Sequence, residues 1–377
     1  MAGSIKIGSL FGIPVLLHWS FLLAIPLFAW IIGTDIGYSS SFVFDVFGVQ
    51  GADTTLIMAG WNPYILGVVV ALALFFCVLV HELAHCIVAL RRGIKINSIT
   101  LLILGGVSSI ENELPNPRDE LPMALAGPVT SAALGIVAAA VVYLVPRPVS
   151  AVGAVAIFLF GYLAILNFIL FAFNLLPAFP MDGGRVLRAW LAQRMPLPKA
   201  TKIAADVGKA FAFLFAIVGV LTLNFILIII GVFIYLGADQ EFYAVRSTVL
   251  LRDVAVKDVM ATNLVTVAPD MPVPEVIRLM YATKHLGFPV LDGAGMLTGM
   301  VTLEDVHRTS EIDRDAKRVG DIMARNLITL PPTAMLSDAF RLMSRNNIGR
   351  IPIVADGRIL GIVTRTDILK VMELREA

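Results

Sequence analysis

Two histidines and a glutamate interrupt an otherwise apolar stretch, VLVHELAHCIVAL, which ends at Leu90. His81 and His85 are four residues apart, so on a helix they share one face and can bind one cation. Glu82 is poorly placed to be a third ligand on that face, but it can hold a water beside the metal. This pattern predicts a Zn²⁺ site in which Glu82 acts on the water.

Chance also produces patterns with three fixed letters in soluble sequences. Here, however, three polar side chains would lie within an apolar span. A charged side chain at bilayer depth costs several kcal/mol, so an ionisable residue there is a functional candidate by default. We therefore interpret the stretch as a site of the kind used by zinc peptidases.

Catalytic zinc takes three protein ligands and leaves one position for water. The other histidines are His18, His285 and His307, and the last two lie in the half of the chain with evenly spread charges. The third ligand is therefore His18, which is typical of an interfacial residue, or a carboxylate. Asp182 is the strongest carboxylate, because neighbouring prolines and glycines break the helix and let it turn inward. Asp182 can instead cap the next helix.

The composition indicates a membrane protein. Of 377 residues, 58% are hydrophobic and 15% are charged, whereas soluble domains are about one quarter charged. The net charge of +1 gives no reason to expect nucleic acid. About six spans are predicted, the first retained rather than removed as a signal peptide. They are residues 14–33, 64–90, 121–145, 151–176, 203–222 and 224–242.

Two segments between or within these spans have their own patterns. Residues 96–117 predict a membrane-associated β-hairpin with Gly105 and Gly106 as its turn. Gly127, Ser131 and Gly135 form a stripe of small residues, which predicts close helix packing and nothing more.

The charges of the loops predict the orientation of the chain in the membrane. Residues 91–95 and 183–202 are basic, whereas residues 34–63 contain three aspartates and no lysine or arginine. Basic loops face the cytosol, so both termini are expected there. We expect a multi-pass protein of a prokaryotic plasma membrane.

HELAH on one span and NLLPAFPMDGG on a later one resemble the site-2 protease family of intramembrane zinc metalloproteases. The resemblance implies His81, His85 and Asp182 as zinc ligands, Glu82 as the catalytic acid and base, and Asn174 as the residue that steadies substrate or oxyanion. It implies cleavage of a peptide bond in or near a transmembrane segment of a membrane-anchored regulator, that is, regulated intramembrane proteolysis. The hairpin would pair with the unwound substrate.

The rest of the chain contains a repeat. VKDVMATNLVTV is matched by VGDIMARNLITL, and each is followed by a strand, a glycine and a T-x-x-D stretch. The repeat resembles a tandem pair of cystathionine β-synthase (CBS) domains, which we place at residues 246–312 and 313–377. CBS pairs also associate face to face, which implies a homodimer.

The CBS resemblance implies an adenine nucleotide ligand, either ATP, ADP or AMP. Thr302 and Asp305 in the first copy, and Thr364 and Asp367 in the second, would supply its hydroxyl and carboxylate contacts. The alternative is that both aspartates only cap the helices that follow them.

The predicted fold is a polytopic α-helical membrane domain, residues 1–245, followed by an α/β CBS pair. The predicted function is that of a zinc metalloendopeptidase with a cytosolic nucleotide sensor. The alternative is a CBS-regulated ion transporter or channel, in which His81, Glu82 and Asp182 line an ion path. An inactive scaffold would not need these motifs intact.

Overall fold

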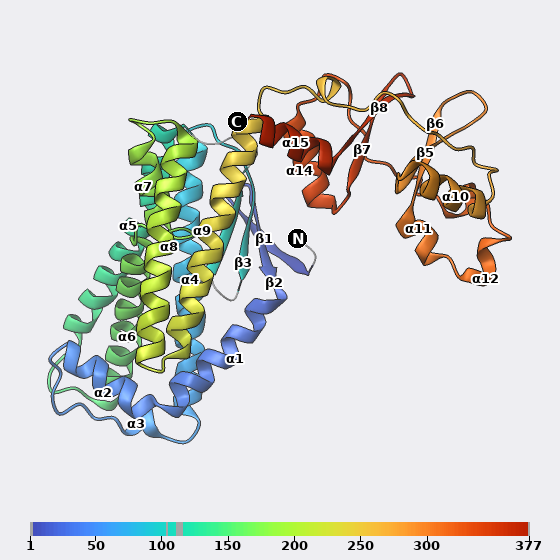
Figure 1. Ribbon diagram of the computed structural model, residues 1–377. Coiled ribbons are helices and arrows are strands. Elements are labelled where there is room, and N and C mark those ends of the chain that lie inside the picture. The colour runs from blue at the N-terminus through green and yellow to red at the C-terminus, as the bar shows by residue number, and fades with distance from the viewer. Residues whose placement is uncertain (1–2, 103–104, 111–115, 376–377) are drawn as a thin grey trace. The chain divides into compact units, whose positions relative to one another are not determined.

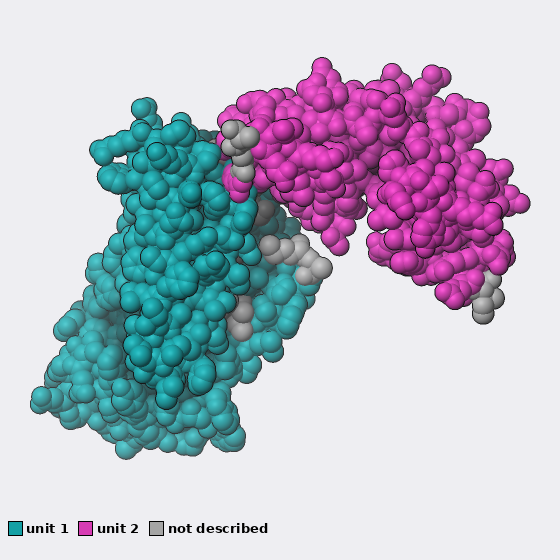
Figure 2. All heavy atoms as spheres, viewed as in Figure 1, with its two compact units in different colours: residues 1–245 teal, residues 246–377 magenta. Residues whose placement is uncertain are grey.

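The computed structural model describes residues 3–102, 105–110 and 116–375. The chain divides into two compact units, Met1–Val245 and Arg246–Ala377. Figure 1 shows the order of the elements, and Figure 2 colours the two units differently. Each unit buries its own hydrophobic clusters, as separately packed domains do.

Long helices dominate the first unit (Figure 1). Five of the described helices are long and apolar enough to cross a membrane, and a pair bent by 79° makes a sixth candidate. The bent pair is α1 (Trp19–Thr34) and α2 (Ile36–Val46). The five are α4 (Asn62–Arg91), α5 (Pro117–Leu144), α6 (Ala151–Asn174), α8 (Leu197–Leu221) and α9 (Phe225–Leu251). The prediction of a polytopic helical domain is confirmed.

The N-terminal region differs from the prediction in two respects. The sequence predicts a first span from residue 14, but Ile13–His18 form strand β2 and α1 begins only at Trp19. Strands on both sides of β2 satisfy its backbone groups, so pairing decides the local structure. The segment 34–63 is predicted to be a loop, but it contains α2 and α3 (Thr55–Met58), because its apolar side chains pack against α6.

A four-stranded sheet, in the order β1-β2-β3-β4, completes this unit. The sequence does not predict strand β1 (Ser4–Leu10), whereas β3 (Ile96–Leu102) and β4 (Gly105–Ile110) form the predicted antiparallel hairpin. Gly105 pairs with Leu102, so both glycines belong to β4 and the prediction that they form the turn is wrong. The connection, residues 103–104, lies outside the described residues.

Helix α5 is the centre of the packing around the polar residues. It contacts α4, α6 and the short α7 (Asp182–Leu191), which in turn contacts α8. Residues from α4, α5 and α7 therefore meet, although they come from distant parts of the sequence.

The second unit contains the two copies of the repeat. Each copy has a helix, two antiparallel strands and a helix. Leu251 and Val256 lie in the hydrophobic core of the second copy, and Val319 and Met323 in that of the first, so the copies exchange their leading segments. The elements are η1 (Val256–Asp258), α10 (Val273–Thr283), β5 (Gly287–Leu291), β6 (Leu297–Thr302), α11 (Leu303–Arg308) and α12 (Glu311–Arg314), then α13 (Val319–Ile322), α14 (Leu336–Asn346), β7 (Arg350–Ala355), β8 (Arg358–Thr364) and α15 (Arg365–Leu374).

Candidate metal centre

The two histidines of the HELAH stretch face the same way from α4. The side chain of His81 is buried, and its ring centroid lies 4.9 Å from that of His85. The Nε2 atoms of the two rings are 3.2 Å apart. The spacing of four residues on a continuous helix produces this pairing, as the sequence predicts.

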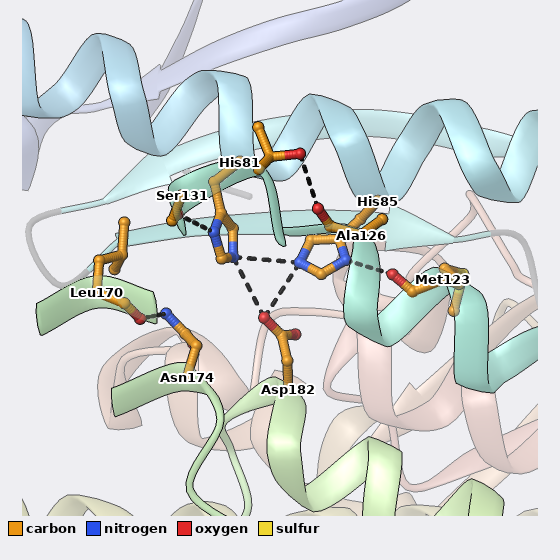
Figure 3. Close-up of polar contacts among 9 residues, drawn as sticks. His81, His85, Met123, Ala126, Ser131, Leu170, Asn174 and Asp182 are labelled. Atoms are coloured by element: carbon orange, nitrogen blue, oxygen red, sulfur yellow. Dashed lines mark hydrogen bonds and ion pairs between the residues drawn. The ribbon is translucent and has the colours of Figure 1, made fainter. Parts of the chain in front are cut away.

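Asp182 reaches the histidines from another part of the chain. It is the first residue of α7 and follows the turn at residues 175–181, after α6. Its Oδ2 atom lies 3.2 Å from Nε2 of His81 and 3.2 Å from Nε2 of His85 (Figure 3). The structure therefore brings the three predicted ligands together.

Two glycines allow α7 to start against the turn that precedes it. A Cβ atom on Gly183 would lie 2.2 Å from the carbonyl oxygen of Leu176, and one on Gly184 would lie 2.6 Å from the backbone nitrogen of Phe179. Neither position has room for a side chain. The Asp-Gly-Gly sequence thus fixes where the carboxylate of Asp182 emerges.

The two Nε2 atoms of the histidines and the Oδ2 atom of Asp182 are spaced as the ligand atoms of a zinc ion. They form a triangle with three edges of 3.2 Å. Zinc bonds to nitrogen and carboxylate oxygen measure about 2.0–2.2 Å, so tetrahedral coordination places ligand atoms about 3.3 Å apart. Two imidazoles and one carboxylate, with the fourth position open, are a donor set of catalytic zinc sites.

Helix α5 contacts both imidazoles at their Nδ1 atoms. Nδ1 of His81 lies 2.8 Å from the hydroxyl of Ser131, and Nδ1 of His85 donates to the carbonyl oxygen of Met123 at 2.7 Å. A carbonyl oxygen can only accept, so it fixes the tautomer of His85 that leaves Nε2 free for a metal, whereas the hydroxyl of Ser131 holds the ring orientation of His81. Between them, a Cβ atom on Gly127 would lie 2.2 Å from Nε2 of His85 and 2.5 Å from Nε2 of His81.

The stripe of small residues on α5 therefore has a larger role than the sequence suggested. Gly135 does serve packing, because its Cβ position faces the ring of Phe168. Gly127 and Ser131 contact the histidines instead, and assigning them to packing alone was wrong. The hydroxyl of Ser131, one helical turn after Gly127, is a signal in the sequence for a polar contact on this face of the helix. The contact of Met123 is made by its backbone carbonyl, so the residue type does not indicate it.

The Asp182 carboxyl is in its metal-binding form. Burial by itself raises its pKa, because the charged form loses hydration. The hydrogen bonds with His81 and His85 outweigh burial and hold the pKa of Asp182 well below its ordinary value. The group is therefore an ionised carboxylate, the form that binds cations.

The three residues line a cavity of about 750 Å³ together with Glu82 and Asn174. Strand β4 passes close to Glu82, since a Cβ atom on Gly106 would lie 2.3 Å from its Cγ atom. The Nδ2 atom of Asn174 donates to the carbonyl oxygen of Leu170 at 3.0 Å, which uses one of its two amide hydrogens. Both residues predicted to act on substrate thus lie at the same cavity as the ligands.

Two further polar residues of the first unit are not among the described residues that line this cavity. His18 caps α1, where its Nδ1 atom accepts from the backbone N–H of Ser20 at 3.3 Å. Asn167 is fully buried and donates to the carbonyl oxygen of Leu163 at 2.9 Å. The geometry therefore favours Asp182 over His18 as the third ligand.

The predicted nucleotide contacts in the second unit are occupied by capping interactions. The hydroxyl of Thr302 donates to Oδ2 of Asp305 at 2.7 Å, and that of Thr364 donates to Oδ2 of Asp367 at 2.6 Å. Each carboxylate also accepts from the backbone N–H of its threonine, which completes a capping box at the start of α11 and of α15.

Comparison with known proteins identifies the class. The family model for peptidase family M50 matches residues 69–153 and 145–215, and the CBS domain model matches residues 256–311 and 319–374. A zinc metalloprotease of Methanocaldococcus jannaschii is 34% identical, over 99% of this chain and 97% of that protein. The protein Rip3 of Mycobacterium tuberculosis is 30% identical, over 99% of this chain and 94% of its own length.

Among solved structures, a site-2 protease from Methanocaldococcus jannaschii is 36% identical and covers 63% of this chain and 95% of its own, with a TM-score of 0.43. The chain belongs to peptidase family M50, the site-2 proteases. It is a zinc metalloprotease of this type with two CBS domains, and several apolar helices make it a multi-pass membrane protein. A CBS-regulated transporter, the alternative raised by the sequence, has no support from these relatives.

Proposed function

We propose that this protease cleaves a peptide bond in or near a transmembrane segment of a membrane-anchored regulator. In this proposal His81, His85 and Asp182 hold the zinc ion. The observation that carries it is the triangle of three 3.2 Å edges between one carboxylate and two imidazoles. The three residues line a cavity of about 750 Å³, which is large enough for a segment of substrate.

When bound, zinc polarises the scissile carbonyl and acidifies a water toward neutral pH. Glu82, which follows His81 on α4, takes the proton of that water and then passes it to the departing amine. The second amide hydrogen of Asn174 donates to the carbonyl oxygen as negative charge develops there. These are the roles that the family resemblance implies for the two residues.

The substrate must be unwound before its peptide bond can react, because a helix shields its own backbone. Strand β4 is the last strand of the sheet, and its residues Gly105 and Gly106 line the cavity. An extended substrate segment would add to this edge by backbone hydrogen bonds. Gly106 allows the strand to lie close to Glu82, so the added segment would lie next to the catalytic groups.

The basic segments that follow α4 and α6 favour a cytosolic position for the metal centre and the CBS pair. A prokaryotic plasma membrane is the proposed location. The CBS pair is proposed to bind ATP, ADP or AMP and to join two chains in a homodimer. Titration calorimetry of the full-length protein with each nucleotide tests the first point, and absence of heat with all three would contradict it.

Metal content and proteolysis test the main proposal together. We expect one zinc per chain in the wild-type protein and in Glu82→Gln, and none in Asp182→Asn. Glu82→Gln should also trap membrane partners, which mass spectrometry identifies and which the wild-type protein then cleaves. The proposal fails if the wild-type protein carries no zinc and Glu82→Gln leaves the trapped partners' processing unchanged.

A further inference from the structure

A second cluster of charged residues is buried next to the metal centre. Arg188, on α7, is 5% exposed, and Glu120, on α5, is 1% exposed. Nε of Arg188 donates to Oε1 of Glu120 at 2.9 Å, its Nη2 atom donates to the same oxygen, and its Nη1 donates to Oε1 of Glu241 on α9 at 2.6 Å. None of the three is among the described residues that line the cavity.

Such a cluster is costly, because the buried charges of Arg188 and Glu120 lose their hydration. The proposed reaction uses neither the arginine nor its partners. Replacing a buried ion pair by apolar residues is often neutral or stabilising, so stability alone is a weak reason to keep one. A role in holding another group in place is the alternative that the surroundings support.

Arg188 connects the helix that begins at Asp182 to the turn that precedes it. It belongs to α7, which begins at Asp182, and its guanidinium carbon lies 5.0 Å above the ring of Phe179 in the preceding turn. Phe179 is buried at 1% exposure, and its backbone nitrogen is the atom that crowds Gly184. Arg188 therefore holds α7 against the turn that precedes it, and the carboxylate of Asp182 lies where the two segments meet.

The same face of α5 then supports every proposed ligand. Ser131 orients His81, the carbonyl of Met123 orients His85, and Glu120 holds Arg188. Residues 120, 123, 127 and 131 are three or four apart and therefore lie along one stripe of the helix. The first two ligands are contacted directly and the third through one arginine.

We propose that Arg188 is a positioning residue that holds Asp182 in ligand geometry, anchored by Glu120 and Glu241. This inference rests on the proposed zinc site. The guanidinium supplies three directed N–H donors to two carboxylates, which the ammonium of lysine cannot reproduce. Losing this support should therefore weaken zinc binding even where the charge is kept.

The test is zinc affinity, measured by competition with a chelator on the full-length protein in detergent. Arg188→Lys should weaken zinc binding up to about 10-fold, less than the about 10–100-fold that follows from losing a direct hydrogen-bond partner of a ligand, because Arg188 acts on Asp182 through the turn and α7. It should also change the visible absorption of the Co²⁺-substituted protein, which reports ligand geometry. Glu241→Gln, which keeps a hydrogen-bond acceptor, should give a smaller loss.

Arg194→Lys is the matched control, because this exposed arginine also stacks on an aromatic ring, that of Trp190 at 5.2 Å, away from the cavity lining. It should bind zinc like the wild-type protein. The inference is overturned if Arg188→Lys, with metal-free unfolding like that of the wild type, keeps wild-type zinc affinity and Co²⁺ absorption. If Arg188→Lys does not fold, Glu241→Gln decides by the same criteria, whereas a wild-type protein without zinc would refute the metal site itself.

Discussion

Replacing Gly127 with alanine should remove the metal and leave the protein folded. The added Cβ atom would lie 2.2 Å from Nε2 of His85 and 2.5 Å from Nε2 of His81. Ordinary contacts begin at 3.4 Å, so the nearer imidazole would have to retreat by about 1.2 Å. Zinc sites tolerate deviations of about 0.2 Å in their bonds. The methyl carbon would thus crowd both of the Nε2 atoms that are proposed to bind the metal.

The size of the effect follows from this displacement. Disturbing an outer partner of a ligand costs about 10–100-fold in metal affinity, and here a ligand itself is displaced. We therefore expect a loss of at least about 100-fold, which is about 2.7 kcal/mol. The fold should tolerate the change, because the imidazoles can rotate into the adjoining cavity and because alanine gains about 0.5–1 kcal/mol over glycine within a helix.

Zinc titration by chelator competition measures the affinity, and thermal unfolding of the metal-free protein measures the stability. Gly135→Ala is the control, since it adds the same methyl group to the same helix and meets Phe168 ring atoms at 3.3 Å. It should bind zinc normally. A Gly127→Ala protein that holds one zinc per chain with wild-type affinity would refute the placement of the two imidazoles.

Three other outcomes are expected. Ser131→Ala removes the hydroxyl beside Nδ1 of His81 and should lower zinc affinity about 10–100-fold, which the same competition assay measures; an unchanged affinity would contradict the contact. Gly106→Ala should displace Glu82 without touching the ligands, so zinc content stays at one per chain while proteolysis falls about 100-fold or more, and equal cleavage rates would argue against Glu82 as the base. Asp305→Ala removes a capping carboxylate and should cost about 1 kcal/mol of stability without any nucleotide present, as thermal unfolding in nucleotide-free buffer would show; an unchanged unfolding temperature would mean that the cap contributes nothing.

The sequence was a good guide where the relevant pattern is local. The spacing of His81 and His85 follows from the helical period, and Asp182 stands out because prolines and glycines surround it in a helix-breaking motif. The spans follow from length and apolar content. All of these features can be seen in a few neighbouring residues.

The remaining features depend on distant contacts and could not be predicted in this way. Strand β2 is as apolar as a span, and only its pairing with β1 and β3 distinguishes it from one. Gly105 and Gly106 indicate a turn in the sequence, because a turn and the close approach of Gly106 to Glu82 both require glycine. The contact of the Met123 carbonyl with His85, and the contacts of Arg188 with Glu120 and Glu241, join residues far apart in the chain. No pattern near the motifs predicts them.

The edge of β4 has a consequence for where the proposed substrates would be cut. Backbone hydrogen bonds along a strand repeat every two residues, and successive side chains point to opposite faces. A substrate that slips by one residue would exchange all its inward and outward side chains. Alternative scissile bonds in one substrate should therefore lie two residues apart, which is about 6.8 Å of extended chain. Minor cleavage products should then be longer or shorter than the main product by an even number of residues.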